Sequence, residues 1–239
     1  MTRYLVGTAG WSISRDVGLA LPPTGSGLIK YASSFSAVEI NSTFYRRHRV
    51  STFERWRASV PASFRFAVKL PRAITHEAEL ASPGEALRTF FGDVSALGEK
   101  LGPILVQLPA SAEFNPRRAR AFFRSLRALH SGPVACEPRN PRWYTDVATR
   151  LLEDYEVARV VADPPRPAAA QELAGAAKLR YFRWHGSPIV YRSSYDADRL
   201  AALGRRIVAD ANAESVWCIF DNTASGAAAV DASRLRALL

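Results

Sequence analysis

The segment Ala37-Val-Glu-Ile-Asn-Ser-Thr-Phe-Tyr45 is a short apolar run that passes directly into a group of polar side chains. Its first residues are typical of a buried strand, and the polar residues would then stand at the carboxyl end of that strand. Barrel and open-sheet enzymes display their catalytic groups at such ends. The segment therefore predicts a strand of a parallel sheet that carries functional residues where it ends.

The same arrangement recurs along the chain, because each apolar run of strand length is followed by a stretch with helical spacing of apolar residues. The expected strands cover residues 4–8, 37–40, 65–70, 104–108, 134–137, 157–162, 179–184 and 216–220. The expected helices cover residues 28–34, 51–60, 82–98, 116–129, 143–154, 168–177, 196–209 and 226–239. Strict alternation of the two predicts a parallel sheet with right-handed crossovers.

Eight strand–helix units without an unusually long linker favour a single (β/α)8 barrel of the TIM type, which about 250 residues usually build. The chain of 239 residues is therefore interpreted as one α/β domain over residues 1–239. An open doubly wound sheet is the alternative, and it usually carries a glycine-rich phosphate turn after its first strand. Gly7-Thr-Ala-Gly10 is too poor in glycine to be such a turn.

The net charge is +10, from 32 Lys and Arg against 22 Asp and Glu, and most of the excess is arginine. Arginine favours phosphate and carboxylate, so a small anionic substrate is the expected partner. The basic cluster Arg46-Arg-His-Arg49 could instead bind nucleic acid, or be a solvated loop. The sequence holds no zinc-finger spacing, RNP motif, Walker A motif or Gly-x-Ser-x-Gly elbow. It gives no indication of oligomeric state.

Cys136 and Cys218 each lie inside an apolar run, which predicts buried free thiols rather than a disulfide or a metal site. Free thiols fit a reducing cytoplasm. The first expected strand begins almost at Met1 and leaves no room for a signal peptide, and no apolar run approaches the roughly 20 residues of a membrane span. We therefore expect a cytoplasmic protein without membrane contact.

Polar residues at the expected strand ends would all face one mouth if the barrel closes. Buried charges must be paired, so mutual pairing is expected among Glu39, Lys69, Glu137 and Arg183. Two carboxylates with a lysine between them could serve as acid, base and electrostatic clamp, or could form an ion network that merely closes the barrel. The candidate catalytic residues are Glu39, Lys69, Glu137 and His185. The candidate substrate-binding residues are Trp11, Asn41, Tyr45, His76, Gln107, Arg139, Arg183, Asp221 and Asn222.

No cofactor is expected. Glu39, Glu137, His185 and Asp221 have ligand types that suit zinc, manganese or magnesium, so a divalent metal is an alternative. The chain lacks His-x-His and His-Glu-x-x-His spacing, and nearby basic residues should already neutralise the acids.

Several segments together resemble the domain-of-unknown-function 72 family, also called YecE-like. They are Val6-Gly-Thr-Ala-Gly-Trp11, Val38-Glu-Ile-Asn-Ser-Thr-Phe-Tyr45, Phe64-Arg-Phe-Ala-Val-Lys-Leu-Pro-Arg72, Ile74-Thr-His76, Leu101-Gly-Pro-Ile-Leu-Val-Gln-Leu-Pro109, Glu137-Pro-Arg139, Tyr181-Phe-Arg-Trp-His-Gly186 and Phe220-Asp-Asn-Thr-Ala-Ser-Gly226. The resemblance implies a TIM-type barrel but supplies no reaction. The family's motif residues match here as Gly10, Trp11, Glu39, Asn41, Tyr45, Lys69, His76, Gln107, Glu137, Arg139, His185, Asp221 and Asn222. Most members carry Ser or Trp after the Glu-Pro-Arg segment, where Asn140 stands here.

These observations favour an enzyme, a hydrolase or an isomerase, that applies general acid–base chemistry to an anionic substrate such as a phosphorylated sugar or a nucleotide. A nucleic-acid-binding or nucleic-acid-processing barrel is the second hypothesis, and a non-catalytic ligand-binding barrel is the third.

Overall fold

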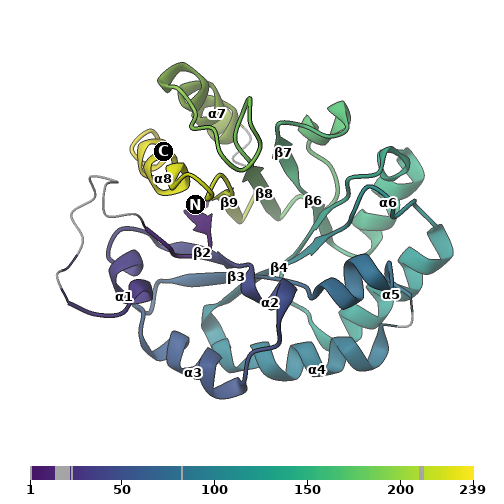
Figure 1. Ribbon diagram of the computed structural model, residues 1–239. Helices are drawn as coiled ribbons and strands as arrows, with labels where there is room; N and C mark the ends of the chain where they lie inside the picture. The colour runs from purple at the N-terminus through teal and green to yellow at the C-terminus, as the bar shows by residue number, and fades with distance from the viewer. Residues whose placement is uncertain (1, 14–21, 23, 82, 210–212) are drawn as a thin grey trace.

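The computed structural model describes residues 2–13, 22, 24–81, 83–209 and 213–239. Within these residues, nine parallel strands form a nearly closed barrel in the order β6-β5-β4-β3-β2-β1-β9-β8-β7, with the helices on its outside (Figure 1). The strands are β1 (Arg3–Ala9), β2 (Ala37–Ile40), β3 (Arg65–Lys69), β4 (Leu101–Gln107), β5 (Val134–Glu137), β6 (Val157–Arg159), β7 (Val161–Asp163), β8 (Leu179–Trp184) and β9 (Ser215–Phe220). The predicted TIM-type barrel is thus confirmed, and the open doubly wound sheet is excluded.

The predicted sixth strand, residues 157–162, is divided into β6 and β7 by Val160. β6 pairs with β5 and β7 pairs with β8, so the two halves occupy opposite edges of the same sheet. Between them the Val160 N–H donates to the carbonyl of Cys136 at 2.8 Å. The division brings the two edges together, and it explains why nine strands stand where the sequence predicted eight.

The helices follow the predicted alternation except at two places: the short helix over Ser42–Tyr45 was not predicted, and no α-helix lies between β7 and β8 in the described residues. They are α1 (Gly27–Ala32), α2 (Ser42–Tyr45), α3 (Val50–Ala58), α4 (Gly84–Val94), α5 (Pro116–Leu129), α6 (Asp146–Asp154), α7 (Ala197–Ala209) and α8 (Ala227–Arg236). In α5, Asn115 caps the first turn, with its side chain accepting from the Arg118 N–H, and Pro116 stands at the start. Its apolar face, Ala119, Phe122, Phe123 and Leu126, is buried.

Three predicted helices differ from the structure. The expected start of the helix over residues 82–98, Ser82, lies outside the described residues, and α4 ends at Val94. The helix expected over residues 143–154 is a short 3-10 turn, Pro141–Trp143, followed by α6, whose cap is Thr145. The helix expected over residues 168–177 is only a 3-10 turn, Ala168–Gln171. The chain beyond it turns back along β6, where the Arg159 N–H donates to the Ala174 carbonyl at 2.9 Å.

The barrel interior alternates with a period of two, because successive side chains of a strand face opposite sides. Ala37, Ala67 and Ala135 face the interior in one layer, where their small side chains leave space for two large rings. Tyr181 and Trp217 fill that space, with ring centroids 6.1 Å apart and planes 7° from parallel. The next inward residue of each alanine-bearing strand is charged: Glu39, Lys69 and Glu137. The alternation of inward and outward residues therefore places charged side chains in the layer at the carboxyl mouth.

Close contact between β1 and β2 depends on Gly7. A Cβ atom at this position would lie 2.0 Å from the Ala37 carbonyl oxygen. The Tyr31 hydroxyl donates to the same carbonyl at 2.9 Å and accepts from the Thr8 N–H at 2.8 Å. Glycine is required here because the backbone of the neighbouring strand occupies the space of a side chain.

Cys136 and Cys218 are buried free thiols, as the sequence predicted. Across the described ranges, no helix is both long and apolar enough to cross a membrane.

Candidate functional site

Arg183, near the end of β8, is the centre of a buried ionic cluster at the carboxyl mouth. Its Nε and Nη2 donate to the two carboxylate oxygens of Glu39 at 3.1 and 2.8 Å. Its Nη1 donates to Glu137 Oε2 at 2.6 Å, and Nη2 also donates to Asp221 Oδ2 at 2.9 Å. The planar fork of a guanidinium fits this geometry. One cation thus binds acids from β2, β5 and the residue after β9, and Arg183 itself is only 1% exposed.

His185 lies between two of these acids. Its Nδ1 is 3.1 Å from Asp221 Oδ2 and its Nε2 is 3.0 Å from Glu137 Oε1. Burial lowers the pKa of His185, but the two carboxylates outweigh burial and raise it. Both ring nitrogens can donate only in the imidazolium form. Burial likewise would raise the pKa of Glu137 and of Asp221, yet Arg183 and His185 hold each pKa below its usual value.

Two further groups complete the cluster. The Tyr181 hydroxyl donates to Glu39 Oε2 at 2.8 Å, and Arg139 Nη2 is 3.5 Å from Glu137 Oε1. Burial and the Glu39 carboxylate raise the pKa of Tyr181, which keeps its proton. Within the described part of the chain, the three acids of the cluster are bonded by Arg183, His185 and Arg139, of which His185 is a cation only when its ring is protonated. Both oxygens of Glu39 are occupied, and its side chain has no exposed surface.

Lys69, at the end of β3, stands beside this cluster without joining it. Its Nζ lies 4.1 Å from the centroid of the Phe44 ring, and no ion pair or hydrogen bond to Nζ is formed by any residue that the structure describes. The expected pairing of Lys69 with the acids is therefore wrong, because Arg183 holds all three of them. Burial and the Arg183 charge lower the pKa of Lys69 to about 8, while Glu39, Glu137 and Asp221 act in the opposite direction.

His76 lies after β3, in a π-helical turn over Ala73–Glu77. Its ring packs edge-on against Phe44, with centroids 4.8 Å apart, and its Nδ1 is 2.9 Å from Thr75 Oγ1. Burial and the positive charges of Lys69 and Arg139 lower the pKa of His76 to about 4. A neutral imidazole and the Lys69 amine therefore both contact the Phe44 ring at the mouth.

A cavity of about 230 Å³ lies against the cluster. Its polar lining comes from Glu137, Arg139, Arg166, His185 and Tyr191. Arg139 Nη2 donates to the Tyr191 hydroxyl at 3.2 Å. Because the Glu137 oxygens are already bonded, the groups that can still bind a ligand are mostly cationic donors. The cavity is therefore suited to a small anion.

A larger groove of about 910 Å³ lies next to the mouth, between α2, α3, the turn at Ala73–Glu77 and α4. Its lining includes Phe44, the exposed Arg46 and Arg72, and Tyr45, which is 78% exposed. Arg47 also lines it but is bound to Asp93 through two hydrogen bonds of 2.6 and 2.9 Å. The predicted basic rim thus exists as a surface, and Tyr45 belongs to it rather than to the buried cluster.

Trp11 and Asn222, two predicted binding residues, pack away from the buried cluster. Trp11 packs edge-on against Trp56 of α3, with centroids 5.0 Å apart. Asn222 is fully buried and donates to the Ser193 carbonyl and to Asp231 Oδ2, so it ties a loop to α8.

Asn41 and Gln107, two other predicted residues, stay at the strand ends. Asn41 precedes α2, and its buried Oδ1 has no hydrogen-bond partner among the described residues. Gln107 is in register with Glu137 on the neighbouring strand and donates to the Leu108 carbonyl at 3.4 Å. Both side chains can offer polar groups to a ligand at the mouth.

Four contributors were not predicted: Phe44, Arg166, Tyr181 and Tyr191. Tyr181 had a signal, since it stands two residues before Arg183 and must share the inward face of β8. Arg166 and Tyr191 lie in loops whose course depends on tertiary contacts. Tyr191 also has a positive φ of 67°, an uncommon conformation for its residue type.

In the described residues, no group of three or more His, Cys, Asp or Glu side chains is arranged to hold a metal ion. The ligand types named from the sequence are present at Glu137, His185 and Asp221. Their polar atoms, however, bond to one another and to Arg183.

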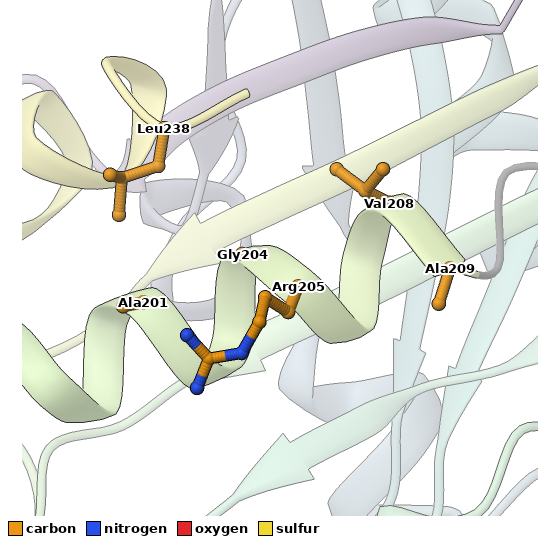
Figure 2. A pocket seen from close by; sticks show the side chains of 6 residues that line it. All are labelled: Ala201, Gly204, Arg205, Val208, Ala209 and Leu238. Carbon is orange, nitrogen blue, oxygen red and sulfur yellow. The ribbon is translucent and has the colours of Figure 1, made fainter.

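A further groove of about 430 Å³ lies on the outer surface, between the second half of α7 and the C-terminal turn (Figure 2). It is lined by Ala201, Gly204, Arg205, Val208, Ala209 and Leu238. These residues come from helices outside the barrel rather than from strand ends, so the groove is separate from the ionic cluster.

A closed parallel barrel with its charged side chains at the carboxyl mouth defines a TIM-barrel protein. The chain belongs to the family described as "Protein of unknown function DUF72", whose model matches residues 5–239. The resemblance seen in the sequence is thereby confirmed.

Relatives of known sequence or structure agree with this assignment. The chain is 30% identical over 164 residues to the UPF0759 protein YecE of Escherichia coli strain K12, a match over 66% of this chain and 58% of that protein. A DUF72 family protein of Enterococcus faecalis has a crystal structure with a TM-score of 0.83 at 23% identity, covering 100% of this chain and 95% of that one. Another, from Thermotoga maritima, has a TM-score of 0.79 at 25% identity and covers 99% and 98%.

Proposed function

We propose that this protein is an enzyme that carries out acid–base chemistry on a small anionic substrate at the carboxyl mouth of the barrel. The observation that carries the proposal is the Lys69 amine. It is buried at the mouth, its pKa is about 8, and no described residue forms an ion pair with it, because the neighbouring acids are bonded to Arg183. A group with a pKa near the working pH is suited to proton transfer.

The proposed roles follow from which atoms can reach a ligand. Lys69 gives and takes the proton, and the imidazole of His76, which packs against the same Phe44 ring, is its partner. Arg139 and Arg166 bind the anionic group in the adjoining cavity. Glu39, Glu137 and His185 have their polar atoms occupied, so we assign them the electrostatic field around Lys69 rather than direct proton transfer.

A hydrolase or an isomerase acting on a phosphorylated sugar or a nucleotide-like compound fits these roles. The proposed chemistry relies on side chains alone, with no metal or cofactor assigned to it. The free thiols Cys136 and Cys218 fit a reducing compartment, which supports a cytoplasmic location.

A substrate screen tests the proposal. The purified protein is incubated with pools of phosphorylated and carboxylated metabolites, and compounds that disappear are found by mass spectrometry. Lys69→Met should abolish the conversion while circular dichroism shows an intact fold. Lys178→Arg, at an exposed lysine, should keep the wild-type rate. If a conversion is found and Lys69→Met retains the full rate, the role of Lys69 is wrong.

The larger groove next to the mouth, which is lined by Tyr45, Arg46 and Arg72 among others, favours a second candidate function, nucleic-acid binding. Arg46, Arg49 and Arg72 are exposed, and the exposed ring of Tyr45 offers a surface on which a base can stack. Binding of a labelled oligonucleotide should then weaken steeply with salt, and Arg46→Ser combined with Arg49→Ser should reduce that salt dependence. Absence of binding at low salt removes this candidate.

A non-catalytic ligand-binding barrel makes a different prediction. The screen would find a compound that is retained by the protein and raises its melting temperature, but is not converted.

A further inference from the structure

The chain distinguishes sharply between its two basic residue types. It contains 28 arginines but only four lysines: Lys30, Lys69, Lys100 and Lys178. Arginine therefore supplies nearly all the positive charge, both on the surface and in the buried cluster. A lysine at the mouth departs from the preference of this chain for arginine. Arginine stays protonated at any physiological pH, whereas lysine can lose its proton and expose a nucleophilic lone pair.

Ion pairing does not explain the lysine either. Lys69 is only 9% exposed, and the acids next to it already have Arg183, His185 and Arg139 as partners. Lys100 offers a contrast, since its Nζ donates to two backbone carbonyls at 2.6 Å and so has a structural role. No such bond involves Lys69 Nζ in the described residues, which leaves its amine available for chemistry.

We infer that Lys69 is a nucleophile that forms an imine with an aldehyde or ketone carrying a phosphate or carboxylate group. The inference deepens the proposed function and rests on it, since it uses the same mouth and the same anion-binding arginines. It adds a covalent step that acid–base chemistry alone does not require.

The step is balanced without any other reactant. The unprotonated Nζ adds its lone pair to the carbonyl carbon, and the π electrons of the C=O bond move to oxygen. A proton passes from nitrogen to that oxygen and gives a carbinolamine. The C–O bond then breaks, the oxygen leaves as water with the second proton of the amine nitrogen, and the nitrogen lone pair completes the C=N bond. We assign the relay of protons during this dehydration to the imidazole of His76, which packs against the same Phe44 ring as the Lys69 amine.

The anionic group of the substrate follows from the cavity beside Glu137. Its available donors are the guanidinium groups of Arg139 and Arg166, which bind phosphate and carboxylate well. Lys69 ends β3 and Arg139 follows β5, and only β4 separates these two strands, so the amine and the anion site lie at the same mouth. The cavity of about 230 Å³ takes the anionic group, and the carbon chain extends from it to the Lys69 amine, which does not itself line the cavity.

Reductive trapping tests the inference. The protein is treated at pH 7.5 with cyanoborohydride and one of three probes: glycolaldehyde phosphate, glyoxylate or neutral glycolaldehyde. Peptide mapping by mass spectrometry then locates the adducts. We expect Lys69 to be labelled by an anionic probe about tenfold faster than the exposed Lys178, and the faster of the two anionic probes shows whether phosphate or carboxylate is preferred.

Variants separate the two parts of the inference. Lys69→Arg should remove the adduct, and Lys178→Arg should leave it unchanged. Arg139→Gln should slow labelling by the anionic probes about tenfold but change labelling by neutral glycolaldehyde little. Because mapping on the wild type compares lysines within one folded molecule, the test holds even if a variant fails to fold.

The outcomes distinguish this inference from the proposed function. If the labelling rate of each lysine follows its solvent exposure and Lys69 is not labelled faster, Lys69 is not a nucleophile. Calorimetry with ethyl phosphate, which has no carbonyl group, then decides what remains. Arg139-dependent binding of ethyl phosphate without any Lys69 adduct overturns the imine and leaves the anion site standing. Absence of both results overturns the imine together with the proposed phosphate site.

Discussion

Arg183→Met tests the energetic core of the site. The change removes four hydrogen bonds, of 3.1, 2.8, 2.6 and 2.9 Å, that bind Arg183 to three carboxylates. Methionine occupies a similar volume, so the cost arises from charge rather than from a cavity. Glu137 and Asp221 would keep His185, whereas Glu39 would keep only the Tyr181 hydroxyl. Breaking one side of a buried ion pair costs about 3–5 kcal/mol, and we expect about 4 kcal/mol at pH 7.

The pH dependence identifies the cause of that loss. In the wild type, Glu137 and Asp221 have lowered pKa values, so their contribution is present above the unfolded value of about 4 and is lost only as the pH falls through the lower folded values. In the variant, an uncompensated buried carboxylate would take up a proton on folding. The free energy of unfolding of the variant therefore rises as the pH falls, by up to about 1.4 kcal/mol per pH unit. The difference in stability between wild type and variant shrinks accordingly.

Urea denaturation at pH 8, 7, 6 and 5 measures this difference. Arg142→Met is the matched control, because the Arg142–Glu113 pair is 3.6 Å long with both side chains more than half exposed. Such a pair contributes about 0–1 kcal/mol. A loss below about 1 kcal/mol for Arg183→Met at pH 7, or a loss that does not shrink toward pH 5, would refute the reasoning.

Three further perturbations follow from single contacts. Tyr181→Phe removes the hydroxyl that donates to Glu39 Oε2 and should lower the free energy of unfolding by about 1–3 kcal/mol, whereas an unchanged urea midpoint would show that the bond contributes nothing. Gly7→Ala would place a Cβ atom 2.0 Å from the Ala37 carbonyl oxygen, so we expect a large fall in melting temperature, and a wild-type value would contradict the close contact. The pKa of His185 is raised, so its contribution is complete below the unfolded value of about 6.5 and is lost as the pH rises through the folded pKa. Urea titrations from pH 6 to 9 should show this loss in the wild type and not in His185→Gln. If the free energy of unfolding varies equally with pH in both proteins, His185 is not an imidazolium in the folded state.

Much of the fold could be predicted from the sequence, because local signals and the barrel geometry agree. Apolar runs ending in proline or polar residues marked the strands, and strict alternation with helices limited the topology to few choices. The division of the sixth strand at Val160 could not be predicted, since it results from hydrogen bonds to strands on both sides rather than from any local residue. The short turn at Ala168–Gln171 likewise depends on the return of the chain along β6.

The sequence predicted which residues lie at the site better than it predicted which of them bond to one another. Charged residues two positions after small inward ones, such as Glu39 after Ala37, had to meet at the mouth once the barrel closed. Which cation would bind the acids depends on side-chain geometry: the fork of Arg183 spans three carboxylates, which a single ammonium cannot do. The partner of Asn222 comes from α8, and its position could not be read from the residues around it.

In the described part of the chain, Arg183 binds the three buried acids and the Lys69 amine at the mouth has no ion-pair partner. Proton–carbon NMR of protein labelled at the lysine ε-carbon tests it directly, because the chain has four lysines and Lys69→Arg identifies the signal in question. We predict that this signal titrates with a midpoint of about 8. A midpoint near the usual value of about 10.4 would show that Lys69 is an ordinary ammonium, and it would contradict the account.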